Sequence, residues 1–195
     1  PVLLQGKDLI GCAQTGTGKT AAFTIPILQT LYNSNHKKEI KALVLTPTRE
    51  LAIQIGESFE AYGKYTGLRH TVIFGGVKQK QQTDELRRGS SILIATPGRL
   101  LDLIEQGFVS LKALDFFVLD EADRMLDMGF FDDIMQVVKR LPENRQTIMF
   151  SATMPPKIRQ LAKTILNNPV EVKIAVSRPP ESIMQTAYVC HESQK

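Results

Sequence analysis

The amino-acid sequence predicts an α/β domain with a doubly wound, mainly parallel sheet and helices on both faces. The chain has 195 residues, 43% of them hydrophobic, which is enough to bury one sizeable core. Short apolar runs alternate with segments of helical spacing, and such alternation is typical of a parallel sheet covered by helices. The expected strands lie near residues 8–12, 42–46, 70–74, 91–95, 116–119, 146–150 and 170–174.

The first expected strand leads into a glycine-rich turn at residues 13–20. The strand itself, residues 8–12, is short and apolar, as buried strands are. Lys19 opens a segment with apolar residues at helical spacing, so the turn lies between a strand and a helix. These apolar residues are Phe23, Ile27 and Leu31.

The composition of this turn suits the phosphates of a nucleotide. Gly16 and Gly18 allow successive backbone N–H groups to converge on phosphate oxygens, with the positive end of the helix dipole behind them. Lys19 would then reach the β and γ phosphates of a nucleoside triphosphate, and the Thr20 hydroxyl would bind Mg²⁺. An ordinary strand-to-helix loop is the alternative, but it gives no reason for Lys19 and Thr20 to be adjacent. The expected phosphate-binding residues are Ala13, Gln14, Thr15, Gly16, Thr17, Gly18, Lys19 and Thr20.

Two of the later helices have clear apolar stripes, which we expect to belong to the core. Thr48 is expected to cap the first of them and Arg49 to lie in its opening turn. Backbone N–H groups would then face outward where a phosphate could bind. The stripes comprise Leu51, Ile55, Phe59 and Tyr62 in the first of these helices and Ile158, Leu161, Ala162 and Ile165 in the last.

An acidic pair follows the expected strand at residues 116–119, which reads as buried on both faces. Asp120 would lie at the carboxyl end of this strand, where open α/β sheets bind their ligands. Asp120 can hold Mg²⁺ through water, and Glu121 can orient and deprotonate an attacking water molecule. A solvated turn is the alternative for an acidic pair alone, but the phosphate loop upstream favours the metal-binding interpretation.

Taken in order, the motifs of the chain resemble those of the DEAD-box family of ATP-dependent RNA helicases. The resemblance covers nearly the whole chain, and alanine at position 13 is what that family usually has. It implies a RecA-like P-loop NTPase domain, the first of two, with ATP and RNA bound across the cleft between them. The motifs are Ala-Gln-Thr-Gly-Thr-Gly-Lys-Thr (13–20), Pro-Thr-Arg-Glu-Leu-Ala (47–52), Gly-Gly (75–76), Thr-Pro-Gly-Arg (96–99), Asp-Glu-Ala-Asp (120–123) and Ser-Ala-Thr (151–153).

The resemblance also implies roles for individual residues. Residues 16–20 would form the ATP and Mg²⁺ site, with Asp120 as the metal-binding acid, Glu121 as the catalytic base and Lys19 assisting the chemistry. Asp123, Ser151 and Thr153 would couple the state of ATP to RNA separation. The expected RNA contacts reach the sugar–phosphate backbone independently of base sequence, through Pro47, Thr48, Arg49, Gly75, Gly76, Thr96, Pro97, Gly98 and Arg99.

The resemblance predicts that the chain is a fragment. Residues 1–176 would form the first helicase domain, and residues 177–195, rich in proline and polar residues, would link it to a second RecA-like domain that supplies an arginine finger. The adenine-reading segment would precede Pro1. The domain alone is therefore expected to have weak ATPase activity or none.

The net charge and the two cysteines indicate which partners and which kinds of site the chain can have. The net charge of +4 and the pI of about 9.1 permit binding of nucleic acid and possible ribonucleoprotein partners. Cys12 and Cys190 lie far apart with no metal-ligand spacing around them, so both are expected to be free thiols. Basic residues are expected near the proposed RNA motifs, namely Lys64, Arg69, Lys78, Lys80, Arg87, Arg88 and Arg99.

Two other functions remain open from the residues alone. One is a P-loop ATPase that moves along DNA, and the other is a non-catalytic RNA-binding scaffold that keeps the motifs as structure. No apolar run approaches the ~20 residues that would cross a membrane, so no membrane association is expected, and the protein should be cytoplasmic, or nuclear in a eukaryote.

Overall fold

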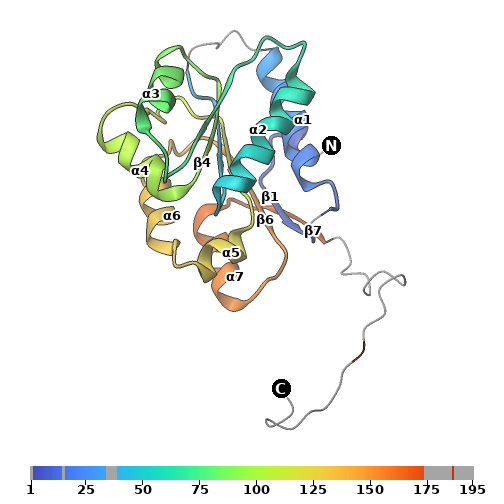
Figure 1. Ribbon diagram of the computed structural model, residues 1–195. Coiled ribbons are helices and arrows are strands. Elements are labelled where there is room, and N and C mark those ends of the chain that lie inside the picture. Colours follow the sequence, from blue (N-terminus) through green and yellow to red (C-terminus); the bar gives the residue numbers. More distant parts are fainter. Residues whose placement is uncertain (1, 15, 34–38, 174–185, 187–195) are drawn as a thin grey trace.

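A computed structural model describes residues 2–14, 16–33, 39–173 and 186 (Figure 1). A short 3₁₀ helix, η1 (Leu3–Gln5), precedes the first strand. The strands are β1 (Leu9–Cys12), β2 (Ala42–Leu45), β3 (His70–Ile73), β4 (Ile92–Ala95), β5 (Phe116–Leu119), β6 (Gln146–Ser151) and β7 (Val170–Lys173). The helices are α1 (Lys19–Tyr32), α2 (Arg49–Gly63), α3 (Gln79–Arg87), α4 (Pro97–Glu105), α5 (Ala122–Asp127), α6 (Phe131–Val138) and α7 (Pro156–Ile165).

The seven strands form one sheet in the order β3-β4-β2-β5-β6-β1-β7. Every strand pair in it is parallel. The predicted doubly wound parallel fold is therefore confirmed, and each predicted strand is present at its expected position.

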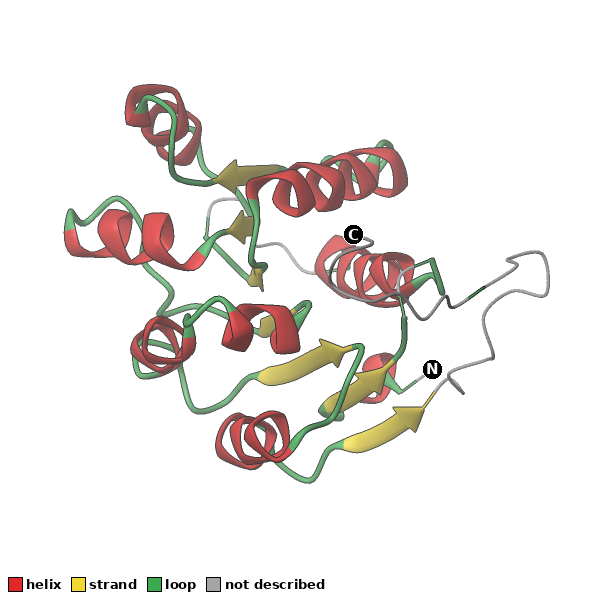
Figure 2. Ribbon diagram, turned by 60° about the horizontal axis from the view of Figure 1, so that its bottom comes forward, coloured by secondary structure: helices red, strands yellow, loops and turns green. Residues whose placement is uncertain are grey.

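Helices cover both faces of the sheet (Figure 2). The buried hydrophobic residues form two clusters, one on each face. Alternate residues of a strand point to opposite faces, so Val44 packs with α1 and α2 while Leu45 packs with α4, α5, α6 and α7. Strands buried on both faces need continuous apolar sequence, and β2, β4 and β5 are buried at every position.

The parallel register brings the carboxyl ends of the strands to one edge of the sheet. Leu45 pairs with Ala95 on one side and Leu119 on the other, and Cys12 pairs with Ser151. Loops that follow these strands therefore begin side by side. This edge is where the predicted motifs lie, because each of them follows a strand.

The helical stripes are mostly as predicted. The four predicted core residues of α7 are buried, but Tyr62 of α2 is 51% exposed, so its assignment to the core was wrong. The α2 stripe runs instead through Ala52, Ile55, Gly56, Phe59 and Gly63. Small residues on this face allow close approach: a Cβ at Gly56 would lie 2.7 Å from Val72 Cγ2. The predicted linker at 177–195 lies outside the described residues except for Thr186.

Candidate functional site

The predicted site residues fall into two groups along the carboxyl edge of the sheet. The phosphate loop, the acidic pair and the Ser-Ala-Thr segment follow β1, β5 and β6, which are neighbours in the sheet. The three motifs expected to contact RNA follow β2, β4 and β3, which are also neighbours. The two groups meet where β2 pairs with β5. The fold therefore places two adjoining sets of polar residues on one edge.

The phosphate loop has the geometry of an anion cradle. Gly16 and Gly18 have φ of 81° and 82°, a left-handed conformation that favours glycine, and a Cβ on either would meet nothing within 4 Å. Gly18 precedes α1, and no side chain caps this helix, so its first N–H groups are left for a ligand. The Thr17 hydroxyl donates to the carbonyl of Gln14 at 2.8 Å and holds the turn together. Thr15 of the predicted set lies outside the described residues.

The acidic pair follows β5 and contains a buried charge. Asp120 is 5% exposed, and its Oδ1 accepts a hydrogen bond from the N–H of Glu121 at 3.0 Å. Burial raises the pKa of Asp120 to about 6, with Lys19 acting in the opposite direction and Glu121 adding to the rise. The charge of Lys19, at the start of α1, therefore acts on Asp120 after β5, although the two residues are far apart in sequence.

Glu121 has an unusual backbone conformation for a residue other than glycine, with φ of 53° and ψ of 49°. The left-handed region costs a side-chain-bearing residue about 1–2 kcal/mol. Its side chain is 14% exposed, and Oε2 lies 3.1 Å from Nη1 of Arg124, which is 54% exposed. Strained backbone of this kind is concentrated at functional sites.

Asp123 joins the acidic motif to the Ser-Ala-Thr segment. Its Oδ2 accepts from the N–H groups of Ala152 and Thr153, at 3.1 and 2.9 Å, and from the Thr153 hydroxyl at 2.9 Å. Ser151 is fully buried and donates to the Thr153 carbonyl at 2.7 Å, and its own carbonyl accepts from the N–H of Ala13 at 3.1 Å. A continuous chain of hydrogen bonds thus connects the acidic motif, this segment and the phosphate loop.

A divalent cation would find few protein ligands here. Within the described ranges no group of three or more His, Cys, Asp and Glu side chains could hold a metal. Thr20 and Asp120 supply oxygen donors, which Mg²⁺ prefers, and Mg²⁺ commonly completes its shell with waters and substrate phosphates. The residues therefore fit a Mg²⁺ ion that binds together with a nucleotide, and do not form a closed metal centre.

In the other half of the edge, Thr48 and Arg49 begin α2 as predicted. The Thr48 Oγ1 accepts from the N–H of Leu51 at 3.3 Å, so its own hydrogen is left to donate outward. The Arg49 side chain is 58% exposed and its Nε donates to Glu50 at 2.6 Å, which lowers the pKa of Glu50. Both groups are accessible to an anionic ligand.

The remaining motifs of this half are a turn and a helix start. Gly75 and Gly76 are exposed, and Gly76 has φ of 83°. Thr96 precedes α4 without capping it, and Pro97 is the first residue of the helix. Arg99 differs from the expectation, because only 11% of its side chain is exposed and its guanidinium is hydrogen bonded within the protein.

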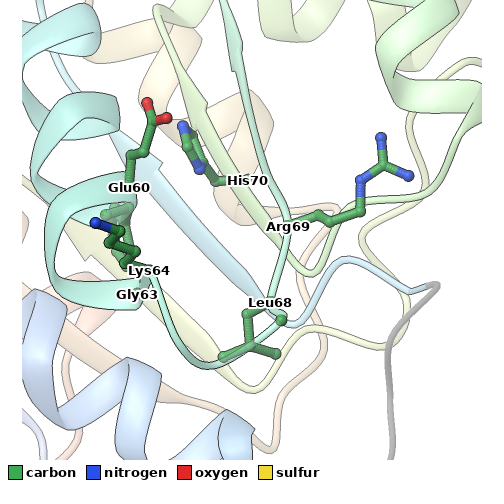
Figure 3. Close-up of a pocket in the computed structure, with 8 residues that line it drawn as sticks. Glu60, Gly63, Lys64, Leu68, Arg69 and His70 are labelled. Atoms are coloured by element: carbon green, nitrogen blue, oxygen red, sulfur yellow. The ribbon is translucent and has the colours of Figure 1, made fainter.

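Several basic residues expected near these motifs lie elsewhere. Arg69 precedes β3 and donates to the carbonyl of Arg88 at 3.0 Å, so both lie at the amino ends of the strands, next to Arg87. Lys64 also lies there, and it lines a hollow of about 390 Å³ together with Arg69 and His70 (Figure 3). The predicted position of Lys64, Arg69, Arg87 and Arg88 was wrong, since a residue before a strand and one after it lie at opposite edges.

This hollow contains none of the predicted site residues. The Glu60 carboxylate lies beside the His70 ring in it (Figure 3). Burial lowers the pKa of His70, and the negative charge of Glu60 acts in the opposite direction. His70 begins β3, so the hollow lies at the edge opposite the phosphate loop.

A comparison with protein families decides the assignment. The family model for DEAD/DEAH box helicases matches residues 1–161. The chain belongs to the DEAD/DEAH box helicase family. In this DEAD/DEAH box domain, one half of the carboxyl edge carries the phosphate loop and the acidic pair, and the other carries the three remaining motifs.

The chain is similar to proteins that are longer than itself. It is 46% identical to the ATP-dependent RNA helicase DeaD of Haemophilus influenzae, over all of the chain and 32% of that protein. It is also 46% identical to the DEAD-box ATP-dependent RNA helicase RhpA of Helicobacter pylori, over all of the chain and 39% of that protein. The chain thus spans about a third of the curated relatives that it matches.

Solved structures agree with the fold. The domain superimposes on a DEAD box protein from Methanococcus jannaschii with a TM-score of 0.83 and 38% identity, over 89% of this chain and 47% of that one. A hypothetical ATP-dependent RNA helicase from Sulfolobus tokodaii gives 0.81 and 40%, over 89% and 50%. In the described part of the domain, no helix is long and apolar enough to cross a membrane.

Proposed function

We propose that the full-length protein is an ATP-dependent RNA helicase, and that this chain is its first RecA-like domain, over residues 1–176. It would couple ATP hydrolysis to local separation of RNA duplexes or remodelling of ribonucleoproteins in the cytoplasm. The observation that carries this proposal is the Asp123 carboxylate, which holds the Ser-Ala-Thr segment by three hydrogen bonds beside the phosphate loop. A change in the nucleotide site can therefore reach a segment outside it.

The ATP site is proposed to consist of residues 13–20 with Asp120 and Glu121. Backbone N–H groups of the loop and of α1 would bind the phosphates, and Lys19 would hold the β and γ phosphates. Thr20 and Asp120 would hold Mg²⁺, whose positive charge would help to neutralise the transferring phosphoryl group. Glu121 would orient the attacking water and accept its proton.

RNA is proposed to bind along the half of the edge that follows β2, β4 and β3. The Thr48 hydroxyl, the exposed Arg49 and the unoccupied N–H groups at the start of α4 are donors, which suit phosphate oxygens and carry no base information. The names of the relatives as RNA helicases support RNA over DNA as the partner.

A second RecA-like domain, linked through residues 177–195, is proposed to complete the site. An arginine finger typically contributes about 10³–10⁵ in rate, so a domain lacking one would hydrolyse ATP slowly. Closure of two domains on RNA would then make hydrolysis depend on RNA.

The deciding experiment measures ATP hydrolysis by the full-length protein without nucleic acid, with single-stranded RNA and with single-stranded DNA. We expect turnover to rise at least about tenfold with RNA and little with DNA, as the proposed domain closure requires. Equal stimulation by DNA would favour a DNA translocase. ATP binding without turnover under any condition would favour a scaffold.

Replacing Lys19 with alanine is expected to weaken nucleotide binding. A hydrogen bond to a charged group is worth about 1.5–3 kcal/mol, so the dissociation constant should rise roughly 10- to 150-fold. Titration of a fluorescent ADP analogue measures it. Lys7→Ala is the matched control, because exposed Lys7 precedes β1 at the opposite edge and its loss changes the net charge equally. Equal affinity of the Lys19→Ala variant and wild type would remove Lys19 from the site.

A further inference from the structure

The glycine turn after β3 is closed at its base by two side chains that are largely buried. Gln82 of α3 donates from Nε2 to the carbonyl of Phe74 at 3.0 Å. Arg99 of α4 donates from Nη2 to the carbonyl of Val77 at 3.2 Å, and from Nη1 to Oε1 of Gln82 at 3.0 Å. Three hydrogen bonds thus run from the residue before Gly75 to the residue after Gly76.

The polar groups of Gln82 and Arg99 find their partners within the protein. Gln82 is 6% exposed and Arg99 has 11% of its side chain exposed, while the third guanidinium nitrogen, Nε, lies 3.8 Å from Asp102 Oδ2. Buried polar groups must find partners within the protein, so breaking one bond leaves the other members of the bridge unsatisfied. The bridge should therefore act as one unit.

The turn needs such a bridge because its two glycines do not fix the backbone. Gly76 has φ of 83°, and a Cβ added to either Gly75 or Gly76 would meet nothing within 4 Å, so no neighbouring atom packs against the turn at these positions. A free glycine turn would lose conformational entropy on binding a ligand, which weakens affinity. The hydrogen bonds to the carbonyls of Phe74 and Val77 make no contact with a ligand, but they keep the turn in one conformation.

We propose that Gln82 and Arg99 position the Gly75–Gly76 turn for the RNA backbone, and that Arg99 acts through this bridge and not as a free charge on a phosphate. The proposal rests on the proposed RNA-binding function. It adds Gln82 to the residues that shape the RNA site and changes the role expected for Arg99. Its planar guanidinium supplies donors in a fixed fork, which a lysine ammonium does not reproduce.

The first test measures the turn itself by hydrogen exchange of the amides at residues 75–78 in the full-length protein. Gln82→Met and Arg99→Lys are expected to accelerate exchange there about tenfold, and Gln82→Glu, which keeps an acceptor for Arg99 but no donor for Phe74, should do so as well. Gln79→Ala is the control, because Gln79 lies on the same helix and its side chain is hydrogen bonded to Gln106 and not to Phe74 or Arg99. Unchanged exchange in all three variants would overturn the bridge, whether or not the protein binds RNA.

The second test measures binding of a labelled oligouridine to the same variants by anisotropy, with a fluorescent ADP analogue in parallel. Gln82→Met and Arg99→Lys should each raise the RNA dissociation constant about tenfold, and the double variant no more than either alone. ADP affinity should stay within about twofold, because the bridge lies in the other half of the edge.

Salt dependence separates positioning from direct contact. Loss of a phosphate contact lowers the slope of log affinity against log salt by about 0.7 for a single strand. We expect the slope to be unchanged in Gln82→Met and in Arg99→Ala, which removes the charge at this position. Either of two results would make Arg99 a direct phosphate ligand. The first is full RNA affinity in Arg99→Lys. The second is a reduced slope in Arg99→Ala while Gln82→Met behaves as wild type. Failure of the wild-type protein to bind RNA would overturn the proposed function and the positioning role with it, while the exchange result still decides the bridge.

Discussion

Replacing Glu121 with glutamine in the full-length protein is expected to reduce RNA-stimulated ATP hydrolysis about 10²–10⁴-fold, which is the usual contribution of a general base. ATP and RNA should stay bound. Glutamine has the same shape as glutamate, so the left-handed backbone at φ 53° and the neighbouring Asp120 should be undisturbed. Only the capacity to accept a proton from water is removed.

The geometry of Glu121 makes this prediction specific. Its side chain is 14% exposed, and Oε2 pairs with Arg124 at 3.1 Å, so in this conformation the ion pair engages one of the two carboxylate oxygens. Phosphate release at saturating ATP and RNA measures the turnover, and binding of the labelled RNA and ADP analogue measures the rest. Glu143→Gln, a change of the same charge at an exposed position far from the edge, should hydrolyse ATP within about twofold of wild type. Turnover near the wild-type rate in Glu121→Gln would show that another group accepts the proton.

Much of the site could be predicted because parallel sheets impose a simple geometry. Any residue that follows a strand lies at the carboxyl edge, so motifs spread from residue 13 to residue 153 meet there. The same reasoning, applied with care, would have placed Arg69 and Arg88 at the opposite edge, because they precede β3 and β4. Nearness in sequence to a motif was the misleading signal.

The hydrogen bond between Gln82 and Arg99 could not be predicted from the sequence. Residues 79–82 read Gln-Lys-Gln-Gln, so α3 begins without an apolar stripe that tells which glutamine faces inward. The partner of Gln82 is 17 residues away on another helix. Only the tertiary structure selects Gln82 from its neighbours. The left-handed backbone of Glu121 was equally hidden, since residues other than glycine rarely adopt it and glutamate gives no hint of it.

Replacing Asp120 with asparagine is expected to act in opposite directions on stability and on catalysis. The pKa of Asp120 is raised from 3.8 to about 6, mainly by burial, so the folded state holds the proton more tightly than the unfolded chain does. A raised carboxyl pKa means that stability is lost as pH rises from about 3.8 to about 6, and stays lost above that. Two pKa units correspond to roughly 2–3 kcal/mol.

Asparagine removes the buried charge and keeps an oxygen that can accept from the N–H of Glu121. We therefore expect the free energy of unfolding of the nucleotide-free domain to rise by about 1–3 kcal/mol at pH 7.5 and to be nearly unchanged at pH 4. Urea denaturation at the two pH values measures this. Asp132→Asn is the control with the opposite sign, because Asp132 is exposed in the first turn of α6 and its charge there favours the helix by a few tenths of a kcal/mol.

In the full-length protein the same change should lower Mg²⁺-dependent hydrolysis at least about 100-fold, because a neutral amide is a poorer partner than a carboxylate for the cation and leaves Lys19 unopposed. An asparagine variant that is no more stable than wild type at pH 7.5 would mean that the buried charge is not costly. One that is more stable and fully active would remove Asp120 from the metal site. The expected pair of results would connect the two effects. Burial makes the ionised Asp120 carboxylate unfavourable in the free domain. A cation bound with ATP would offset that cost, so the residue that destabilises the free domain would be the one that favours Mg²⁺ binding.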